Sequence, residues 1–553
     1  MHLNSKRLTE RDRTPHIEKN IVKKLRHWKQ NDYIDAATFD RIRPTGTGMP
    51  RLYGLPKVHK DGLPMRIILD MLDSPYHATA QWLSELLQPI RRILTPHSLK
   101  DTFQFIECIR NANLSNARML SLDVSALFTN VPLRETMSYL CDEIVKRNIH
   151  LGIPIQEVEE PLLMCTSNVQ FSFNGDLYRQ IDGVAMGSPL GPLLAEVFMS
   201  KLESGPLRNS ISNFCVYKRY VDDIFCIVDS ELEADVLLNE FNSAHPSINF
   251  TMEIESEGSL AFLDVLLHRL EDGSIQRSVY RKKTWTSQYT HFHSFVPIKQ
   301  KRNLIRCLTD RARKICSLDT LEAELGKIAD ILRTNGYPEK FINRNMSLGN
   351  LDVPVQKANK KPIYITLPYK GESATEILSR RLKTAIERTY NAAKVNISFK
   401  TFPVLIPHLK DRRPYLCASF CIYSFTCCCQ AGYVGRTSRR LVDRIKEHNP
   451  KWLRNGSTKP IKSAIGSHLI DSNNQHGQFD VDDCFKVIYR VPFNRSRAIR
   501  HRILATAEAI GIRLRHPQLC AQKSHVQALL LPWPRDNWFD AVTKTGLNSG
   551  VDE

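Results

Sequence analysis

Two adjacent acids, Asp222 and Asp223, stand inside an otherwise apolar run that extends from Tyr220 to Val228. Neighbouring carboxylates repel one another, and removing them from water is costly unless a cation offsets their charge. A third acid, Asp123, lies at the end of another apolar run, where a carboxylate has no packing purpose. Such short apolar runs predict strands, and the Asp-Asp step predicts a tight turn between two of them. The three acids therefore predict a site for paired divalent cations, Mg²⁺ or Mn²⁺.

The alternative for the acidic pair is a solvated Asp-Asp turn, but the charge of the whole chain favours the metal site. Lys and Arg number 77 against 58 Asp and Glu, which gives a formal net charge of +19. This excess predicts a polyanionic partner, because each phosphate that a cation neutralises releases a counterion. Paired cations on the three acids would activate a 3′-hydroxyl and stabilise a leaving pyrophosphate.

The order of the sequence patterns predicts a multidomain protein of the mixed α/β (α+β) class. The chain has 553 residues, enough for several domains, and its 42% of hydrophobic residues excludes wholesale disorder. Helical periodicity occurs in 17–42, 76–111 and 298–335, whereas strand-like runs alternate with helical stretches in 115–270. Nowhere do 18 or more apolar residues run together, so we expect no transmembrane helix and no membrane partner.

The acidic motif and its neighbours resemble those of a known family. Tyr220-Val221-Asp222-Asp223 resembles the YxDD box of reverse transcriptases, and Asp123 resembles the acid of their first palm motif. Segment 183–199 resembles the helix that grips primer and template in these enzymes. Three further segments resemble one branch, the Penelope-like retroelements: 50–66, 262–269 and 279–294. The resemblance implies a right-hand fold of fingers, palm and thumb, and RNA-directed DNA polymerase activity.

The resemblance also implies a role for each matching residue. The Mg²⁺ ligands would be Asp123 and Asp222, with Asp223 in support. The substrate-binding residues would be Lys57, Arg66, Phe128, Gly187 and Pro189. Lys57 and Arg66 would offset the negative charge of a triphosphate. The Phe128 ring would fill the space of a ribose 2′-hydroxyl. An ordinary core position is the alternative for this ring. Ile67 follows the arginine, where the family usually has proline.

A second group of polar residues points to phosphodiester cleavage. Tyr423 and Tyr433 lie in two strand-like runs, and Arg444 and His448 are four residues apart on the basic helix that follows, so they share one face. A tyrosine or a histidine can deprotonate water, while a guanidinium neutralises the charge that develops on a phosphate. The alternative is a hairpin followed by an ordinary amphipathic helix.

This second pattern resembles the GIY-YIG endonuclease family, whose domain follows the reverse transcriptase in Penelope-like elements. The resemblance implies that Glu508 binds the metal ion of the nuclease. Cys421 stands where the family usually has glycine, and Gln518 and Cys520 occupy the stretch of its late asparagine. An inactive nuclease is therefore an alternative.

A cysteine cluster within the same region predicts a structural zinc site. Cys427 and Cys429 lie between the two tyrosine motifs, and His468 and His476 follow. Two cysteines and two histidines make a complete tetrahedral set for Zn²⁺. The C-x-C spacing is tighter than usual, so Cys428 is a substitute ligand. Free thiols and surface histidines are the alternative, although Penelope-like endonuclease domains carry a similar set.

These patterns divide the chain into seven expected parts. They are an N-terminal helical remnant (1–43), fingers (44–114), palm (115–275), a thumb-like basic helical region (276–350), a basic linker with a small β-α-β unit (351–415), the endonuclease domain (416–530) and a tail (531–553). The family usually carries a longer N-terminal region, so we expect an N-terminally truncated copy or an incomplete gene model.

The expected function is RNA-directed DNA synthesis, with an endonuclease that nicks target DNA and thereby primes it. The expected partners are template RNA, target DNA and deoxynucleoside triphosphates, and function alone places the protein in the nucleus. One alternative is a decayed or domesticated copy that only binds nucleic acid. Another is a polymerase with an inactive nuclease.

Overall fold

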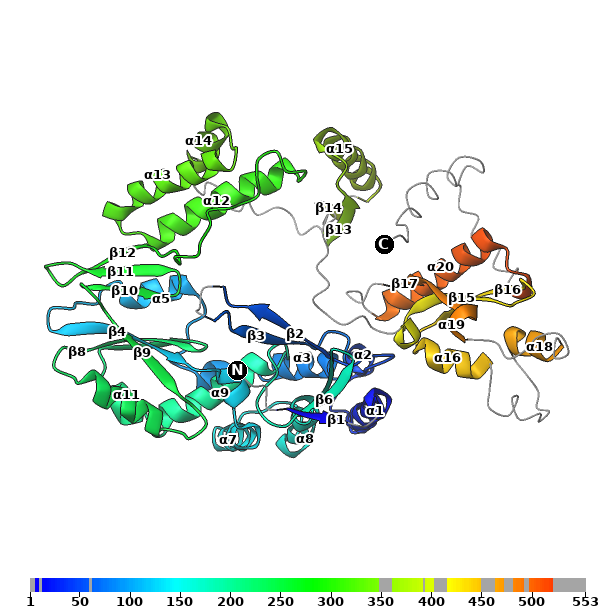
Figure 1. Ribbon diagram of the computed structural model, residues 1–553, viewed down its shortest axis with the longest axis horizontal. Coiled ribbons are helices and arrows are strands. Elements are labelled where there is room, and N and C mark those ends of the chain that lie inside the picture. Colours follow the sequence, from blue (N-terminus) through cyan, green and yellow to red (C-terminus); the bar gives the residue numbers. More distant parts are fainter. Residues whose placement is uncertain are drawn as a thin grey trace. The chain divides into compact units, whose positions relative to one another are not determined.

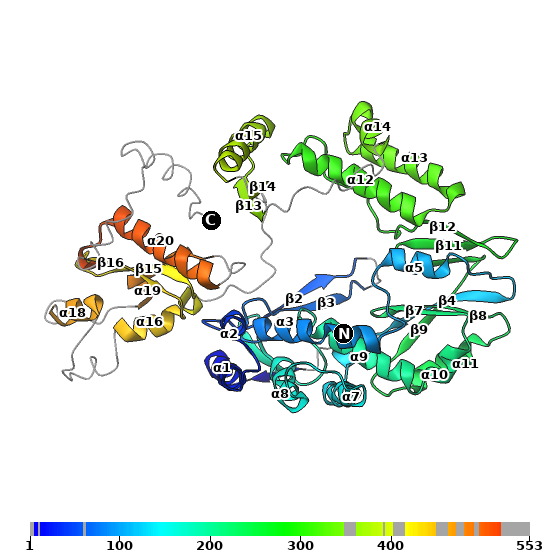
Figure 2. The same ribbon diagram turned by 180° about the vertical axis from the view of Figure 1, so that it is seen from behind.

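The computed structural model describes residues 5–8, 12–58, 62–347, 361–390, 393–401, 415–448, 463–471, 481–491 and 497–520. The chain forms two compact units, whose elements are labelled in Figure 1 and seen from behind in Figure 2. The first unit comprises Met1–Asp12, Pro50–Leu72 and Thr79–Asp411, and the second comprises Arg13–Met49, Asp73–Ala78 and Arg412–Glu553. The predicted mixed α/β multidomain class is confirmed. The expected tail, 531–553, lies outside the described residues.

A five-stranded mixed sheet forms one part of the first unit, in the order β1-β6-β5-β2-β3. Its strands are β1 (Ser5–Leu8), β2 (Arg51–Pro56), β3 (Met65–Asp70), β5 (Gln170–Phe173) and β6 (Asp176–Gln180). The β2–β3 hairpin is antiparallel, and an ion pair of 2.8 Å joins Arg51 to Asp70 at its open end. The other end of the hairpin carries Lys57 and Arg66.

A four-stranded antiparallel sheet, in the order β7-β8-β4-β9, carries the predicted acids. Its strands are β4 (Ala117–Val124), β7 (Val216–Tyr220), β8 (Asp223–Asp229) and β9 (Phe250–Ile254). Side chains alternate between the two faces of a strand. Met119 and Phe225 therefore share a face with Asp123 and Asp223, and they pack in one core with Phe105 of α5 (Thr102–Ile109).

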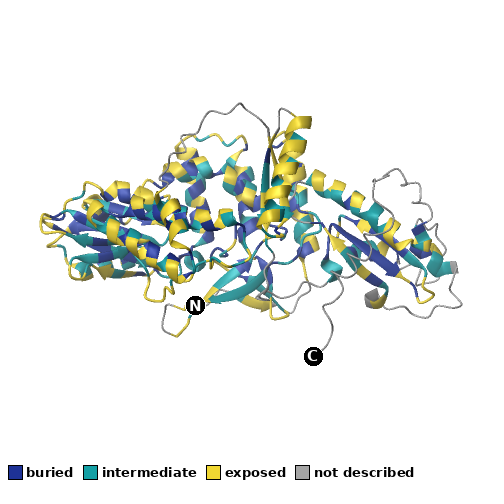
Figure 3. Ribbon diagram, turned by 90° about the horizontal axis from the view of Figure 1, so that it is seen from above, coloured by how far each residue is buried: buried dark blue, intermediate teal, exposed yellow. Residues whose placement is uncertain are grey.

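Helices surround these sheets, and Figure 3 shows that the strands are mostly buried or half-buried while many helix faces are exposed. Helix α11 (Ala234–Ser243) packs on β9, where the rings of Phe241 and Phe250 lie 5.4 Å apart. The other helices beside these two sheets are α3 (His77–Leu86), α4 (Gln88–Leu94), α6 (Leu127–Asn130), α7 (Leu133–Lys146), α8 (Ile155–Thr166), α9 (Gly191–Ser204) and α10 (Arg208–Ser212). Of these, α9 is buried along nearly its whole length.

Two buried glutamates on α9 are each paired with an arginine of another element. Glu196 accepts a hydrogen bond of 2.5 Å from Nε of Arg91 on α4. Glu203 accepts one of 2.6 Å from Nε of Arg219 on β7, and the side chains of this second pair are only 2% and 0% exposed. Tyr217 donates its hydroxyl to the same Glu203 carboxylate at 3.1 Å. The pair therefore fixes β7 to the central helix without leaving a buried charge uncompensated.

A three-stranded sheet and three helices follow the four-stranded sheet along the chain. The sheet contains β10 (Ser259–Phe262), β11 (Val265–Arg269) and β12 (Ile275–Val279). Helices α12 (Ile298–Ile315), α13 (Leu318–Thr334) and α14 (Glu339–Ser347) lie beside one another in Figure 1 and share a core that includes Ile305, Ile328 and Ile342. The basic helical block expected in 298–335 is thus a helical bundle.

A small β-α-β unit lies in the region where the sequence led us to expect one, between 362 and 404. Strand β13 (Lys361–Pro368) pairs in parallel with β14 (Ala393–Lys400), and α15 (Glu372–Thr389) connects them. A parallel pair needs such a crossover, because a tight turn joins only antiparallel strands.

The second unit is built on a three-stranded antiparallel sheet in the order β16-β15-β17. Helix α20 packs on the face that carries Ile422 and Val434, whereas α16 packs on the face of Tyr423 and Tyr433. Its elements are α1 (Thr14–Gln30), α2 (Ala36–Ile42), the 3₁₀ turn η1 (Tyr415–Cys417), β15 (Cys421–Thr426), β16 (Gly432–Thr437), α16 (Leu441–His448), α18 (Ala464–Asp471), α19 (Val481–Cys484), β17 (Phe485–Arg490) and α20 (Arg497–Arg515).

The N-terminal segment 13–49 belongs to this second unit, a grouping that the sequence patterns do not indicate. Nε of Arg440 donates to the backbone oxygen of Thr47 at 2.9 Å, and Arg497 donates to the hydroxyl of Thr45 at 2.9 Å. Gly46 adopts a left-handed φ of 62°, and a side chain there would collide with Ser419. The joint between the two segments is therefore closely packed.

None of the helices in the described ranges is both long and apolar enough to cross a membrane. No disulfide bond joins the cysteines that the structure describes.

The buried pair on α9 leads to a stability prediction. Glu203→Ala should destabilise the first unit by about 3–5 kcal/mol, because it leaves Arg219 buried without a counter-ion. Asp176→Ala is the control, since it removes the exposed partner of Arg7 and should leave stability nearly unchanged. Urea unfolding followed by tryptophan fluorescence measures both. Equal midpoints for the two variants would contradict the importance of the pair.

Candidate functional site

The register of two strands brings the predicted acids together. Asp123 on β4 lies directly opposite Asp223, the first residue of β8. A two-residue turn, Val221 and Asp222, joins β7 to β8, and the hairpin register extends to Tyr220 opposite Asp223. The oxygen atoms of the three acids do not all come within 4.8 Å of one another in the described structure. Asp123 and Asp223 therefore lie side by side where two inner strands of the four-stranded sheet (the palm sheet) end, and Asp222 lies on the adjoining turn.

The turn has an unusual backbone conformation. Val221 adopts a left-handed φ of 59°, which is rare for a β-branched residue and stores strain. Arg219 holds the turn, because its Nη1 donates to the backbone oxygen of Val221 at 3.2 Å. The amide of Val124 donates to the backbone oxygen of Asp222 at 3.0 Å and attaches the turn to β4. Hydrogen bonds from Arg219 and from Val124 therefore hold the strained turn on both sides.

The electrostatics at the turn favour a cation. Burial raises the pKa of Asp222, and the neighbouring Asp123 raises it further, whereas Arg66 and Lys57 act in the opposite direction. Arg66 is exposed on β3 and Lys57 follows β2, so the hairpin brings two cations within electrostatic range of the acids. Ile67 continues β3 opposite Gly54, and its difference from the family pattern does not interrupt the strand.

The structure gives partial information on the other predicted substrate-binding residues. Phe128 lies on α6 and is half-buried, and its contact with a nucleotide sugar stays a prediction. Its backbone oxygen accepts from the amide of Val184 at 2.6 Å. Gly187 has a φ of 118°, and any Cβ there would lie 2.2 Å from the backbone oxygen of Leu69. This glycine therefore has a packing purpose, and contact of Gly187 and Pro189 with substrate stays a prediction.

A chain of hydrogen bonds joins three of the residues predicted for cleavage. Nε of Arg444 donates to the Tyr423 hydroxyl at 3.2 Å. This hydroxyl lies 2.6 Å from Nε2 of His448, whose Nδ1 lies 2.6 Å from the hydroxyl of Ser463. Arginine can only donate, so the Tyr423 oxygen accepts from Arg444, and one assignment that satisfies every contact has the Tyr423 hydroxyl donating to an unprotonated Nε2. Nδ1 then carries the proton and donates to Ser463.

The other two residues predicted for cleavage, Tyr433 and Glu508, lie close to these hydrogen-bonded side chains. The rings of Tyr433 and His448 meet edge to face at 5.6 Å. Glu508 lies on α20 and pairs with Arg436 of β16 at 3.2 Å. Burial raises the pKa of Tyr423, and the charges of Tyr433 and Glu508 raise it further. Tyr423 is therefore a neutral phenol at physiological pH.

Gly435 explains why a glycine follows the second tyrosine motif. A Cβ at this position would lie 2.6 Å from the Tyr423 hydroxyl and 2.6 Å from the ring of Tyr433. Such distances are far below van der Waals contact, so only glycine lets both tyrosines approach the strand. The sequence motif thus reflects the space that the hydroxyl of Tyr423 needs.

Gln518 and Cys520 cover an edge of the sheet. The Gln518 side-chain oxygen accepts from the amide of Gly432 at 2.8 Å. The thiol of Cys520 lies 3.3 Å from both the amide and the carbonyl oxygen of Val434. β16 is an edge strand, and these contacts satisfy backbone groups that it would otherwise leave unpaired.

Three of the four predicted zinc ligands come together. The ligand atoms of Cys427, Cys429 and His468 lie within 4.8 Å of one another, and Sγ of Cys429 is 3.4 Å from Nε2 of His468. Sulfur and imidazole nitrogen are the donors that Zn²⁺ prefers, so the donor set fits this metal. Cys428 is exposed, with its sulfur 3.8 Å from that of Cys427. His476 lies outside the described residues.

Sequence reasoning missed several residues that the structure places at these sites. Arg219 and Glu203 hold the acidic turn, Ser463 orients His448, and Arg436 pairs with Glu508. A signal existed for Glu203 alone, since an acid on a strongly apolar helix needs a partner. The identity of that partner depends on tertiary structure.

Comparison with protein families agrees with the palm geometry. Residues 58–255 match the family model "Reverse transcriptase (RNA-dependent DNA polymerase)". The chain contains a reverse transcriptase domain. All three palm acids lie within the matched residues, as do Arg66 and Phe128. Residues 288–347, which include α12, α13 and α14, match the model "Animal helix-turn-helix domain". No curated protein matches the chain.

Solved structures with a similar arrangement include telomerase from Candida albicans in complex with a fragment of telomeric RNA. It has 13% identity and a TM-score of 0.39, and the match covers 54% of this chain and 60% of that one. Sicinivirus 3Dpol, an RNA-dependent RNA polymerase, has 12% identity and a TM-score of 0.33, with 51% and 63% covered. This chain thus spans less than two thirds of each relative, and similarity this low carries no functional argument.

The space around Gly435 leads to a second prediction. Gly435→Ala should destabilise the second unit by about 1–3 kcal/mol, because the methyl group displaces two buried tyrosines. Gly326→Ala is the matched control, since no atom lies within 4 Å of its Cβ position on α13. This control should stabilise its helix by up to about 1 kcal/mol. Thermal unfolding followed by circular dichroism compares the two, and a harmless Gly435→Ala would refute the close approach.

Proposed function

We propose that this chain is an RNA-directed DNA polymerase. The observation that carries the proposal is the arrangement of Asp123, Asp222 and Asp223 where two inner strands of the palm sheet end, within a segment that matches reverse transcriptases. The substrates would be template RNA and deoxynucleoside triphosphates. The basic character of the chain supports polyanionic substrates.

The residues at the turn fit Mg²⁺ or Mn²⁺. Carboxylate oxygens are the donors that these ions prefer, and Asp222 is buried beside a second acid, where a cation offsets repulsion. Asp123 and Asp222 would hold the ions, with Asp223 in support. Bound ions of this kind lower the pKa of an attacking hydroxyl and neutralise the leaving group. Arg219 and Glu203 keep the turn in place.

The other residues of the site would bind and select the nucleotide. Lys57 and Arg66 would donate to the triphosphate, whose negative charge attracts both side chains. Phe128 would exclude a 2′-hydroxyl, a role that its half-buried ring supports. Gly187 and Pro189 precede α9 and would contact the primer and template.

Replacement of one acid tests the polymerase proposal. Asp222→Asn should reduce primer extension on an RNA template at least about 1,000-fold, because a neutral amide no longer balances the cationic charge. Asp229→Asn is the matched control, since it is exposed at the other end of β8 and should retain normal activity. Unchanged melting temperatures show that both variants are folded. Extension by Asp222→Asn at the wild-type rate would remove this acid from the site.

We also propose that the second unit nicks DNA, and the hydrogen-bonded chain of Arg444, Tyr423 and His448 supports this activity. Burial keeps Tyr423 neutral, so its oxygen would take a proton from water only as it gives its own to Nε2 of His448. Arg444 would neutralise the charge developing on the phosphate. Glu508 would bind the metal ion that the GIY-YIG resemblance implies.

The two activities together fit a Penelope-like retroelement protein. A nick in target DNA exposes a 3′-hydroxyl, and this end would prime DNA synthesis on the template RNA. Such a reaction takes place on chromosomal DNA, so we propose the nucleus as the site of action.

Nicking and polymerisation should be separable by mutation. Glu508→Gln should abolish nicking of a supercoiled plasmid, because it removes the charge of the metal ligand, yet leave primer extension unchanged. Arg513→Ala, near the end of the same helix, is the control for effects on α20. Agarose gels with Mg²⁺ or Mn²⁺ measure nicking. A wild-type chain that never nicks under either metal would favour the inactive-nuclease alternative.

We further propose that Zn²⁺ occupies the site of Cys427, Cys429 and His468, with His476 as the fourth ligand. A closed tetrahedral set leaves no position for substrate, so the metal would stabilise the β15–β16 hairpin rather than catalyse.

Metal analysis of the full chain tests the zinc proposal. The purified protein should contain one Zn²⁺, and Cys429→Ser should lose it and melt at a lower temperature. Cys307→Ser, which changes an exposed cysteine on α12, is the control and should keep the metal. A well-folded wild-type chain without zinc would reject the site.

A further inference from the structure

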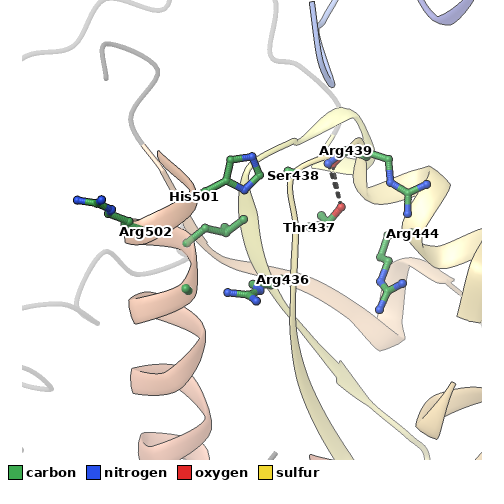
Figure 4. A pocket seen from close by; sticks show the side chains of 9 residues that line it. Arg436, Thr437, Ser438, Arg439, Arg444, His501 and Arg502 are labelled. Atoms are coloured by element: carbon green, nitrogen blue, oxygen red, sulfur yellow. Dashed lines mark hydrogen bonds between the residues drawn. The ribbon is translucent and has the colours of Figure 1, made fainter. Parts of the chain in front are cut away.

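The second unit contains a pocket of about 480 Å³ between the β16–α16 turn and α20 (Figure 4). Its polar lining consists of Arg436, Thr437, Ser438, Arg439, Arg444, His501 and Arg502. Among the described residues that line it, none is acidic. Its volume suits a nucleotide-sized group rather than a single ion.

The basic side chains enter the pocket from two elements. Figure 4 shows Arg436, Arg439 and Arg444 on the β16–α16 segment, and His501 reaching from α20 toward Ser438. Arg502 follows His501 on the same helix and also lines the pocket, although Figure 4 shows its guanidinium turned away from the other labelled side chains. Arg513, an exposed arginine farther along α20 that does not line the pocket, therefore serves as an internal reference.

Protein carboxylates offset only part of this charge. Glu447 pairs with Arg439 at 2.6 Å and with Arg444 at 2.8 Å, and Glu508 pairs with Arg436. The surroundings of His501 show the remaining excess. Burial lowers the pKa of His501, and several arginines, Arg497 and Arg436 foremost, lower it further. Basic side chains this close to one another repel, so a bound anion would stabilise the pocket.

The pocket borders the proposed cleavage cluster. Arg444 lines the pocket and also donates to the Tyr423 hydroxyl, so one guanidinium belongs to both. We propose that the pocket binds a backbone phosphate of the DNA strand next to the bond that is cut, with Arg439 and His501 as binding residues. This inference rests on the proposed nuclease and names where its substrate is held. Arg439 would exchange its pairing with Glu447 for a phosphate, which accepts two parallel hydrogen bonds from a guanidinium.

The N-terminal segment braces the wall of this pocket. Arg440 follows Arg439 in the chain and donates to the backbone of Thr47. A Cβ on Gly46 would lie 3.1 Å from the backbone oxygen of Ser438, so the two segments are in close contact at the pocket rim. Phosphate binding by Arg439 therefore depends on the docking of segment 13–49 as well as on its own side chain.

Site-resolved protection of arginine tests the proposal in the full wild-type chain. Phenylglyoxal modifies accessible guanidinium groups, and peptide mass spectrometry reads each arginine separately. A saturating DNA duplex should slow modification of Arg439 about fivefold or more, because a phosphate covers its guanidinium. Modification of Arg513 should be unchanged. Inorganic phosphate at the same total phosphate concentration forms the second arm and should give little protection.

The outcomes separate this inference from the nuclease proposal. Protection of Arg439 by DNA supports phosphate binding in the pocket even if the wild-type chain never nicks DNA. In that case only the nuclease proposal fails. No protection of Arg439, or equal protection of Arg439 and Arg513, overturns the assignment of a phosphate to this pocket. Equal protection by inorganic phosphate overturns the assignment to DNA. Where nicking occurs, Arg439→Ala should raise the KM for DNA about tenfold with kcat retained, and Arg513→Ala should change neither.

Discussion

The buried ion pair between Arg219 and Glu203 is the interaction on which the palm site depends. It joins β7 to the central helix α9, and the same guanidinium holds the strained turn through the backbone oxygen of Val221. Two charges removed from water stabilise a structure only when both remain paired and hydrogen-bonded. The pair therefore couples the packing of the palm core to the position of Asp222.

In the second unit, the position of the Tyr423 hydroxyl depends on a different kind of contact. There, the absence of a side chain at Gly435 creates room for the Tyr423 hydroxyl, and Arg444 donates to that hydroxyl from α16. In both units an uncommon backbone feature and an arginine adjoin a predicted site residue: Arg219 holds the turn of Val221 and Asp222, and Arg444 contacts Tyr423 beside Gly435. Loss of either backbone feature would displace that residue without changing its chemical groups, because the residues that position it are not the ones proposed to react.

The sequence predicted much of both sites, since short apolar runs and unexplained acids or tyrosines are local signals. The strand that ends at Asp123, the turn at Asp222 and the helix that carries Arg444 and His448 all followed from such patterns. The left-handed Val221 did not, because tertiary contacts override the preference of a β-branched residue. Periodicity also shows which face of an N-terminal helix is buried, but not that segment 13–49 packs with the distant C-terminal residues.

The interleaved order of the two units has a consequence for the synthesis of the protein. Segment Arg13–Met49 is made first, whereas its packing partners begin at Arg412. At roughly 5–20 residues per second, the early helices wait on the order of tens of seconds before their partners leave the ribosome. Their apolar faces are exposed during that interval, and contacts so distant in sequence form slowly. The growing chain is therefore most exposed to misfolding, and most dependent on chaperones, while most of the first unit is being made.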